Sequence, residues 1–228
     1  MRLLAIGDIH GYLQALDALL DSVKPQGTDQ FIFLGDYVDK GPDVRGVIDR
    51  LIDFAKQHHV IFLRGNHDQM LIDAYRDPEK LSVFECLGGE NPLSSYGEGG
   101  TPSLLSRIPE SHWEFLEGSR DYFETAEFIF VHGGIRPEID PVDEDRERLQ
   151  WTTLSLAAPH RSGRTVICGH SSQQSGLIAD LGHTICVDTG IARGKWVTCL
   201  DVRTFAYWQS DAEGKCRDGV LRGQVTTV

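Results

Sequence analysis

Aspartate, histidine and asparagine gather in three short glycine-flanked stretches in the first third of the chain. These stretches are GDIHG at residues 7–11, GDYVDKG at residues 35–41 and GNHD at residues 65–68. Two later stretches, HGG at residues 132–134 and GH at residues 169–170, add two more histidines. Carboxylate oxygens and imidazole nitrogens are common ligands of divalent metal ions in proteins. The spacing therefore predicts a metal site assembled from loops that lie far apart in the sequence.

Six of these side chains could jointly bind two metal ions, because each offers an oxygen or nitrogen ligand. Asp8 and His10 alternate along an extended segment, so both can reach one ion. Asp36 lies between them and Asn66 in the order of the loops, and one carboxylate can bridge two ions about 3.5–4 Å apart. The side chains that would complete the second ion are Asn66, His132 and His170. Paired cations lower the pKa of bound water, which can then attack a phosphoester near neutral pH.

The apolar pattern of the first third predicts strands that alternate with helices. The predicted strands are residues 3–6, 31–34 and 60–63, and the predicted helices are residues 12–21 and 44–56. This βαβαβ order implies parallel strands with right-handed crossovers. In such sheets, ligands collect at the carboxyl ends of the strands. Each predicted strand leads into one of the three motif loops, so the loops are expected to meet at one edge.

Residues 77–124 differ in character from the segments around them. They contain several prolines and glycines between short helical pieces, so they are predicted to form a small helical cap insertion. A strand is predicted at residues 128–131, and the last third adds predicted strands at residues 165–168, 184–187, 196–200 and 205–208. We therefore expect residues 1–228 to form a single α/β domain, a β-sandwich of two mixed sheets flanked by helices.

The chain carries 22 basic and 34 acidic side chains, which gives a formal net charge of −12. This balance argues against a general nucleic-acid binder, which needs a basic face for the phosphate backbone. It leaves a phosphate substrate open, because bound divalent cations reverse the local field. The five cysteines include no C-x-x-C pair, so we expect reduced thiols in a cytoplasmic protein. No signal peptide and no apolar run of about 18 residues is evident, so no membrane association is expected.

The three loop motifs resemble GDxHG, GDxVDRG and GNHE, which occur in this order in calcineurin-like metallophosphoesterases. More narrowly, they resemble the short bacterial and phage form of the PPP-type serine/threonine protein phosphatases, and the resemblance extends to residues 188–190. It implies a metallophosphoesterase-type sandwich and the ligand set given above, with Asp36 shared by both ions. It also implies that His67 protonates the leaving alkoxide and that Asp39 orients His67. The third motif ends in Asp68, where the family motif has glutamate, and this change is expected to be minor.

Four positions bear on how phosphate would be held. Arg64, just before the third motif, matches an arginine that binds phosphate in the family. Lys40 stands where most protein phosphatases have arginine, so it keeps the charge but lacks the bidentate fork. Thr153 stands where bacterial relatives usually carry another phosphate-binding arginine. Arg193 or Arg161 could take over the role of that missing arginine.

The resemblance favours a metal-dependent phosphomonoesterase that hydrolyses phosphoserine or phosphothreonine in proteins by in-line attack of a metal-bridging hydroxide. The alternative is a hydrolase of dinucleoside polyphosphates, such as diadenosine tetraphosphate, or of small phosphate esters. His10 favours the first interpretation, because symmetrical diadenosine tetraphosphate hydrolases usually carry glutamine there. A non-catalytic scaffold is disfavoured by the intact ligand set and by the pair His67 and Asp39. The mixed ligands lead us to expect two divalent ions, Mn²⁺ first, with Fe or Zn as other choices.

Overall fold

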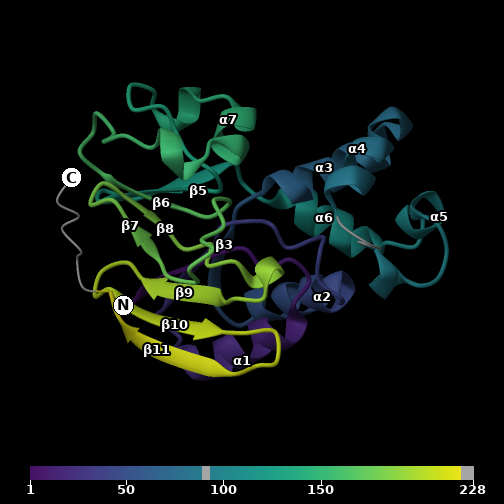
Figure 1. Cartoon of the computed structure of the whole chain (residues 1–228), viewed down its shortest axis with the longest axis horizontal. Coiled ribbons are helices and arrows are strands. Elements are labelled where there is room, and N and C mark those ends of the chain that lie inside the picture. The colour runs from purple at the N-terminus through teal and green to yellow at the C-terminus, as the bar shows by residue number, and fades with distance from the viewer. Residues whose placement is uncertain (89–92, 222–228) are drawn as a thin grey trace.

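The structure is a sandwich of two β-sheets with helices outside them (Figure 1). It is a computed structural model and describes residues 1–88 and 93–221. The first sheet contains, in spatial order, β11 (Cys216–Val220), β10 (Ala206–Ser210), β9 (Val197–Asp201), β1 (Leu3–Ile6), β2 (Gln30–Phe33) and β3 (His59–Phe62). The second sheet contains β4 (Tyr122–Glu124), β5 (Phe128–Val131), β6 (Thr165–Cys168), β8 (Thr184–Cys186) and β7 (Ala179–Asp180). Both sheets mix parallel and antiparallel pairs, so the predicted fold class is confirmed.

Helices lie on the outer sides of both sheets and at one end of the sandwich (Figure 1). The α-helices are α1 (Leu13–Val23), α2 (Val44–Ala55), α3 (Asn66–Arg76), α4 (Leu81–Leu87), α5 (Thr101–Leu105), α6 (Glu110–Gly118) and α7 (Arg146–Trp151). The 3-10 turns are η1 (Pro78–Lys80), η2 (Ser94–Tyr96), η3 (Pro141–Asp143), η4 (Leu154–Leu156) and η5 (Ile191–Arg193). Within the described residues, none of these helices has both the length and the apolar character needed to cross a bilayer.

The strands β1, β2 and β3 run parallel, and their last residues lie level with one another. Ile6 pairs with Phe33, and Phe33 pairs with Phe62. The three motif loops therefore leave the sheet side by side, as the βαβαβ order predicts. In the second sheet, β5 and β6 are also parallel. Their ends lead into the two histidine stretches at residues 132–134 and 169–170.

The two faces of the first sheet pack against different partners. Side chains alternate along β1, so that Leu4 and Ile6 join the apolar core formed with α1 and α2. Leu3 and Ala5 point the other way and pack with residues of the second sheet. Because both faces are buried, β1 has the unbroken apolar sequence LLAI. This packing fixes the strand end from which Asp8 and His10 follow.

The predicted cap, residues 77–124, is tied to the body of the domain at several points. Leu116 of α6 belongs to the main apolar core. His112 uses both ring nitrogens, one with Tyr96 Oη at 2.8 Å and one with Asp49 Oδ1 of α2 at 2.9 Å. The last residues of the segment form β4, which pairs with β5 and so belongs to the second sheet. The description as one domain with a cap insertion stays a prediction.

The third motif differs from the loop that the sequence predicts. Asn66 is the first residue of α3, so Asn66 and His67 lie in a helical turn. The Asp68 carboxylate accepts a hydrogen bond from Gly65 N at 2.9 Å, which caps the start of this helix. The edge strand β11 was also not predicted, because its sequence CRDGV lacks the apolar run of a buried strand. A helical start fixes the Asn66 and His67 side chains more firmly than a loop would.

Candidate metal centre

The motif loops enclose a cavity of about 390 Å³ at the carboxyl edge of the parallel strands. Five of the six predicted metal ligands line it: Asp8, His10, Asp36, Asn66 and His170. The sixth, His132, is fully buried and contacts Asn66. The remaining lining residues are Lys40, His67, Leu87, Trp151, Ser172, Asp188, Ala192 and Arg193. The fold therefore brings all six predicted ligands together from separate loops of both sheets.

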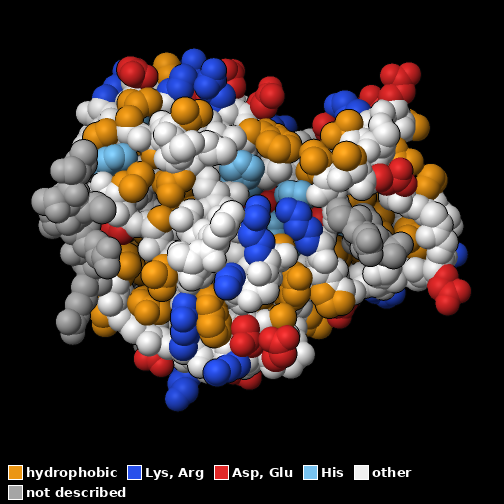
Figure 2. Space-filling model, viewed as in Figure 1, with side chains coloured by type: hydrophobic (Ala, Val, Ile, Leu, Met, Phe, Trp, Pro, Cys, Tyr) orange, Lys and Arg blue, Asp and Glu red, His pale blue; other side chains and the backbone are white. Residues whose placement is uncertain are grey.

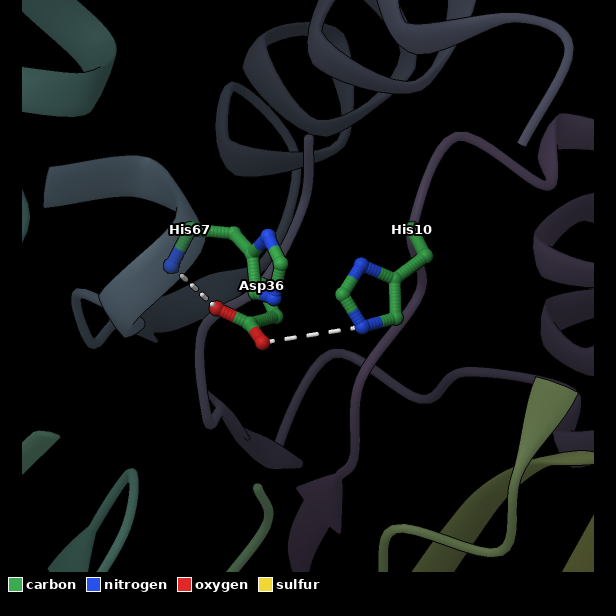
Figure 3. A group of neighbouring side chains, drawn as sticks. All are labelled: His10, Asp36 and His67. Atoms are coloured by element: carbon green, nitrogen blue, oxygen red, sulfur yellow. Dashed lines mark hydrogen bonds and ion pairs between the residues drawn. The ribbon is translucent and has the colours of Figure 1, made fainter. Parts of the chain in front are cut away.

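One group of possible ligand atoms comes from His10, Asp36 and His67 (Figure 3). These three residues offer atoms that all lie within 4.8 Å of one another. His10 Nε2 is 3.6 Å from Asp36 Oδ2, and the backbone N–H of His67 donates to Asp36 Oδ1 at 3.0 Å. Asp8 approaches the same ring nitrogen, with Oδ2 4.0 Å from His10 Nε2. His67, expected only as a proton donor, thus lies directly beside the predicted first ion.

A second group of ligand atoms comes from Asp36, His132 and His170, again within 4.8 Å of one another. Asn66 Oδ1 lies 2.9 Å from His132 Nε2 and 3.0 Å from His170 Nδ1. Asp36 Oδ1 is 3.4 Å from His132 Nε2. Asp36 therefore belongs to both groups, which is the position that a bridging carboxylate needs.

Hydrogen bonds behind the histidines fix which ring nitrogen faces the cavity. His10 Nδ1 lies 2.9 Å from the carbonyl of Val38, and His132 Nδ1 lies 2.8 Å from the carbonyl of Leu34. A carbonyl only accepts, so Nδ1 donates its proton to it and Nε2 is the ring nitrogen that faces the site. At His132, Nε2 faces the Asn66 amide oxygen, and a bound cation would take the place of a proton between them. Acceptor atoms that converge in this way fit a bound cation.

Burial and mutual charge strongly perturb the titration of these groups. Burial would raise the pKa of Asp36, but His132 and the neighbouring imidazoles hold it well below its usual range. Burial would lower the pKa of His132, but Asp36 raises it to about 10. For His10 and His170 burial prevails and lowers the pKa to about 3 and about 4, so both imidazoles are neutral at pH 7. Asp36 thus requires a positive charge beside it, which suits a divalent cation.

Two more buried carboxylates, Asp8 and Asp188, line the cavity. Asp8 accepts hydrogen bonds from the backbone N–H of His170 at 3.1 and 3.2 Å. Burial, and next the charge of Asp188, raise the pKa of Asp8 well above its usual range. Burial also raises the pKa of Asp188 to about 6. Sequence reasoning noted residues 188–190 only as part of the family resemblance, yet Asp188 adds a further negative charge that a cation would offset.

The backbone of the site adopts angles that are unusual for residues with side chains. Among the described residues, seven other than glycine have positive φ: four lie in the motif loops, namely His10, Asp36, Asp39 and Lys40, and a fifth, His170, lies in the second histidine stretch. Non-glycine residues in this region are strained and concentrate at functional sites. The structure therefore marks the same loops that the residue types single out.

His67 and Asp39 form the pair that the sequence predicts. His67 Nδ1 lies 2.7 Å from Asp39 Oδ2, and both side chains are buried. Burial raises the pKa of Asp39 to about 6. The second oxygen, Oδ1, is buried without a hydrogen-bond partner in the described chain. Because Asp39 accepts the proton on Nδ1, His67 can present Nε2 to the cavity.

The family model of the calcineurin-like phosphoesterases matches residues 1–189. The chain belongs to this family. Membership makes it a metal-dependent phosphoesterase and implies divalent metal ions, for which the residues above provide fitting donors.

Two curated relatives are similar to this phosphoesterase, but the similarity covers different shares of their lengths. It is 26% identical to the asymmetrical bis(5'-nucleosyl)-tetraphosphatase PrpE of Oceanobacillus iheyensis, over 87% of each chain. It is 33% identical to a symmetrical bis(5'-nucleosyl)-tetraphosphatase of Pseudomonas putida, over 66% of this chain and 52% of that relative. The chain thus spans about half the length of the symmetrical enzyme but most of the asymmetrical one.

A solved structure of a candidate diadenosine tetraphosphatase has the same fold. Its TM-score is 0.67, and the match covers 97% of this phosphoesterase and 95% of that chain. The sequences are 19% identical, so the likeness concerns the fold.

The cations of the phosphoesterase do not all lie where the sequence predicts. Lys40 lines the cavity, but Arg64 does not. The Arg64 guanidinium instead donates to the Ser119 carbonyl at 2.9 Å and to Gln69 Oε1 at 3.1 Å. It also donates to the Glu117 carbonyl, so it binds the carbonyls that end α6, where cations are favoured. The predicted phosphate contact of Arg64 is therefore not supported.

The two arginines considered as replacements for the residue missing at Thr153 also differ in position. Arg193 lines the cavity. Arg161 pairs with Asp140 in an exposed ion pair and is absent from the lining. Thr153 bonds to Ser155 and lies outside the cavity as well. Of these candidates, Arg193 is the one beside the predicted metal ligands.

Asp68 supports the phosphoesterase site, and the minor effect expected of aspartate in place of glutamate here stays a prediction. Besides capping Gly65 N, its fully buried carboxylate accepts from Asp36 N at 2.9 Å and from Tyr37 N at 3.0 Å. It therefore joins the second motif loop to the start of α3. The sequence signal for this role is an acidic residue at the third position of a helix, which is a capping position.

Proposed function

We propose that this phosphoesterase hydrolyses dinucleoside polyphosphates such as diadenosine tetraphosphate, and that it cleaves them asymmetrically. The observation that carries the proposal is the similarity to an asymmetrical bis(5'-nucleosyl)-tetraphosphatase along 87% of both chains. The similarity to the symmetrical enzymes is confined to about half of their length. Dinucleoside polyphosphates therefore take the place of phosphorylated proteins, which the loop motifs favour as the substrate.

We propose the same ligand assignment as the motifs imply. Asp8, His10 and Asp36 would hold the first ion, and the second would be held by Asp36, Asn66, His132 and His170. Two divalent cations bound there would stabilise charge on the phosphate oxygens and activate water. The mixture of carboxylate, amide and imidazole donors supports Mn²⁺, with Fe or Zn as alternatives. Metal analysis of the active protein would distinguish them.

His67, Asp39 and Lys40 are the other proposed participants. Asp39 holds the Nδ1 proton of His67, so that Nε2 can give a proton to the leaving oxygen as the ester or anhydride bond breaks. Lys40 reaches the cavity as an exposed point charge and would attract the phosphate groups.

The second candidate function is hydrolysis of phosphoserine or phosphothreonine in proteins. The buried pair of His67 and Asp39, 2.7 Å apart, is the observation that favours it. A serine alkoxide leaves far less readily than a nucleotide phosphate, so it benefits most from a positioned proton donor.

Product analysis tests the proposal. The protein is loaded with Mn²⁺ and incubated with diadenosine tetraphosphate, and the nucleotides are separated by chromatography. Asymmetrical cleavage yields equal amounts of ATP and AMP, because water adds across an outer bridge of the tetraphosphate. ADP as the sole product would refute the asymmetrical assignment. An intact dinucleotide, together with release of phosphate from a phosphoserine peptide, would favour the second candidate.

A further inference from the structure

We propose that Arg193 binds a second phosphate group of the substrate and thereby selects polyphosphates over single phosphate esters. The inference rests on the proposed function and extends it to a residue outside the loop motifs. Arg193 is exposed and lines the same cavity as the predicted metal ligands. Figure 2 shows Lys and Arg side chains beside histidine side chains at the hollow in the middle of this face.

The backbone that carries Arg193 is firmly held. The turn η5 lies between Gly190 and Gly194, whose φ angles of 82° and 71° suit glycine. Arg193 N donates to the Gly190 carbonyl at 2.9 Å, and Gly190 N donates to the Asp188 carboxylate at 3.0 Å. Ile191, the first residue of the turn, is fully buried in the main core. Because Asp188 itself lines the cavity, the turn is tied directly to the metal centre.

The Arg193 side chain, in contrast, is not engaged within the described chain. No hydrogen bond or ion pair of its guanidinium is found among residues 1–88 and 93–221, and the same holds for the Lys40 ammonium group. Arg64 and Arg161, by comparison, are bound to carbonyls and to a carboxylate. Two cations that have no side-chain partner among the described residues thus face one cavity, where each can bind an anion.

The charges and shapes of the lining fit a nucleoside polyphosphate. The phosphate under attack would bind to the metal ions and to Lys40. Every further phosphate group of the substrate adds about one negative charge. A guanidinium can hold two phosphate oxygens at once, which the Lys40 ammonium cannot do. Leu87 and Trp151, 45% and 41% exposed, add apolar surface for a nucleoside. A substrate with one phosphate would leave Arg193 without a partner.

The test compares Arg193→Ala with the matched control Lys195→Ala. Lys195 lies two residues further along and is absent from the cavity lining. Steady-state rates are measured with Mn²⁺ on diadenosine tetraphosphate and on p-nitrophenyl phosphate, and ADP binding is measured by calorimetry. Arg193→Ala should lower kcat/KM for the dinucleotide about ten- to a hundredfold, mostly through KM, and weaken ADP binding similarly. The kcat/KM of Arg193→Ala for p-nitrophenyl phosphate should stay within about threefold of the wild type. All values measured for Lys195→Ala should stay within the same limit.

Equal losses on both substrates, or no loss on either, would overturn the inference about Arg193. Wild-type protein that hydrolyses the aryl phosphate but not the dinucleotide would instead overturn the proposed function. In that case the ADP titration still decides about Arg193, because unchanged ADP affinity in Arg193→Ala contradicts a phosphate contact and weakened affinity supports it.

Discussion

His10, Asp36 and His170 hold φ angles of 50°, 54° and 60°, which residues with side chains rarely adopt. Each such residue costs on the order of 1 kcal/mol, and the surrounding structure must offset that cost. Hydrogen bonds between the first two loops do so: His10 N donates to the Asp36 carbonyl at 2.8 Å and Gly11 N to the Tyr37 carbonyl at 2.9 Å. The strained backbone therefore sets the directions of the ligand side chains before any ion binds.

His67 is the residue whose proposed role is most open to a direct test. If it protonates the leaving group, His67→Asn should reduce turnover of an alkyl phosphate about 10²–10⁴-fold. An activated aryl phosphate, whose leaving group needs no proton, should lose much less. His112→Asn is the control, because His112 is also buried and hydrogen-bonded but lies outside the cavity. Equal losses on the two substrates would argue against a proton donor.

Between elements, the Asp68 carboxylate connects the second motif loop to α3. It accepts hydrogen bonds from the N–H groups of Gly65, Asp36 and Tyr37. Asp68→Asn turns one acceptor into a donor that faces these N–H groups, so it should destabilise the fold by about 1–3 kcal/mol. Urea unfolding of the wild type and the variant, with a chelator present, measures this difference in the free energy of unfolding. The control Asp53→Asn, at an exposed ion pair, should change stability by less than about 0.5 kcal/mol. Equal effects of the two variants would contradict the connecting role.

Arg2 joins the start of β1 to the end of α1 and to Asp29, the residue before β2. The Arg2 guanidinium donates to the Asp29 carboxylate at 3.1 Å and to the carbonyls of Val23 and Lys24 at 3.1 and 3.0 Å. Burial would raise the pKa of Asp29, but Arg2 holds it below its usual value. A carboxyl with a lowered pKa stabilises the fold above its unfolded-state pKa, about 3.9. That contribution disappears as the pH falls through the folded-state value.

The variant Asp29→Asn should therefore lose about 1–2 kcal/mol of stability at pH 7. Its difference from the wild type should shrink when both are unfolded in urea near pH 3, below the usual carboxyl pKa of about 3.9. A difference of the same size at both pH values would show that charge is not the cause.

The sequence predicts the parallel strands β1 and β2 well because they are buried on both faces. The apolar runs of β1 and β2 and the helical spacing of α2 carry their own signal. The edge strand β11 has no such signal, because none of its residues is buried and its sequence CRDGV contains two charged residues and a glycine. The sequence predicts a loop at the start of α3, since Asn66 and His67 follow a strand end and are poor helix formers. The cap from Asp68 overrides that preference.

The convergence of the six proposed ligands could be predicted for a similar reason, since each lies within four residues of a strand end. The placement of Arg64 could not, because it depends on the carbonyls that end α6, which are more than fifty residues away. The position of Arg193 depends equally on the tertiary packing of the turn η5. Long flexible side chains are located by such distant partners, and local sequence carries little information about them.

At the scale of the molecule, the metal centre lies where the two sheets meet. Four proposed ligands, Asp8, His10, Asp36 and Asn66, follow strands of the first sheet, while His132 and His170 follow strands of the second. Direct contacts already cross this boundary, from His132 to the Leu34 carbonyl and from His170 N to Asp8. Bound ions would therefore link the sheets and stabilise the whole domain.

Thermal unfolding should show this stabilisation. A ligand at about 100 times its Kd adds about 2.7 kcal/mol to the stability of the folded state. For a chain of 228 residues, Mn²⁺ should then raise the Tm by about 5–10 °C relative to protein with a chelator. Asp36→Asn, which removes the shared carboxylate charge, should lose most of the shift. An unchanged Tm of the wild type on adding Mn²⁺, Fe²⁺ or Zn²⁺ would speak against a metal centre.

The most direct test of the account measures substrate preference on one metal-loaded preparation. The value of kcat/KM is determined with Mn²⁺ for diadenosine tetraphosphate and for a phosphoserine peptide. The account predicts a preference of more than about tenfold for the dinucleotide, because the cavity offers Lys40 and Arg193 to several phosphates. An equal or higher value for the phosphopeptide would contradict it.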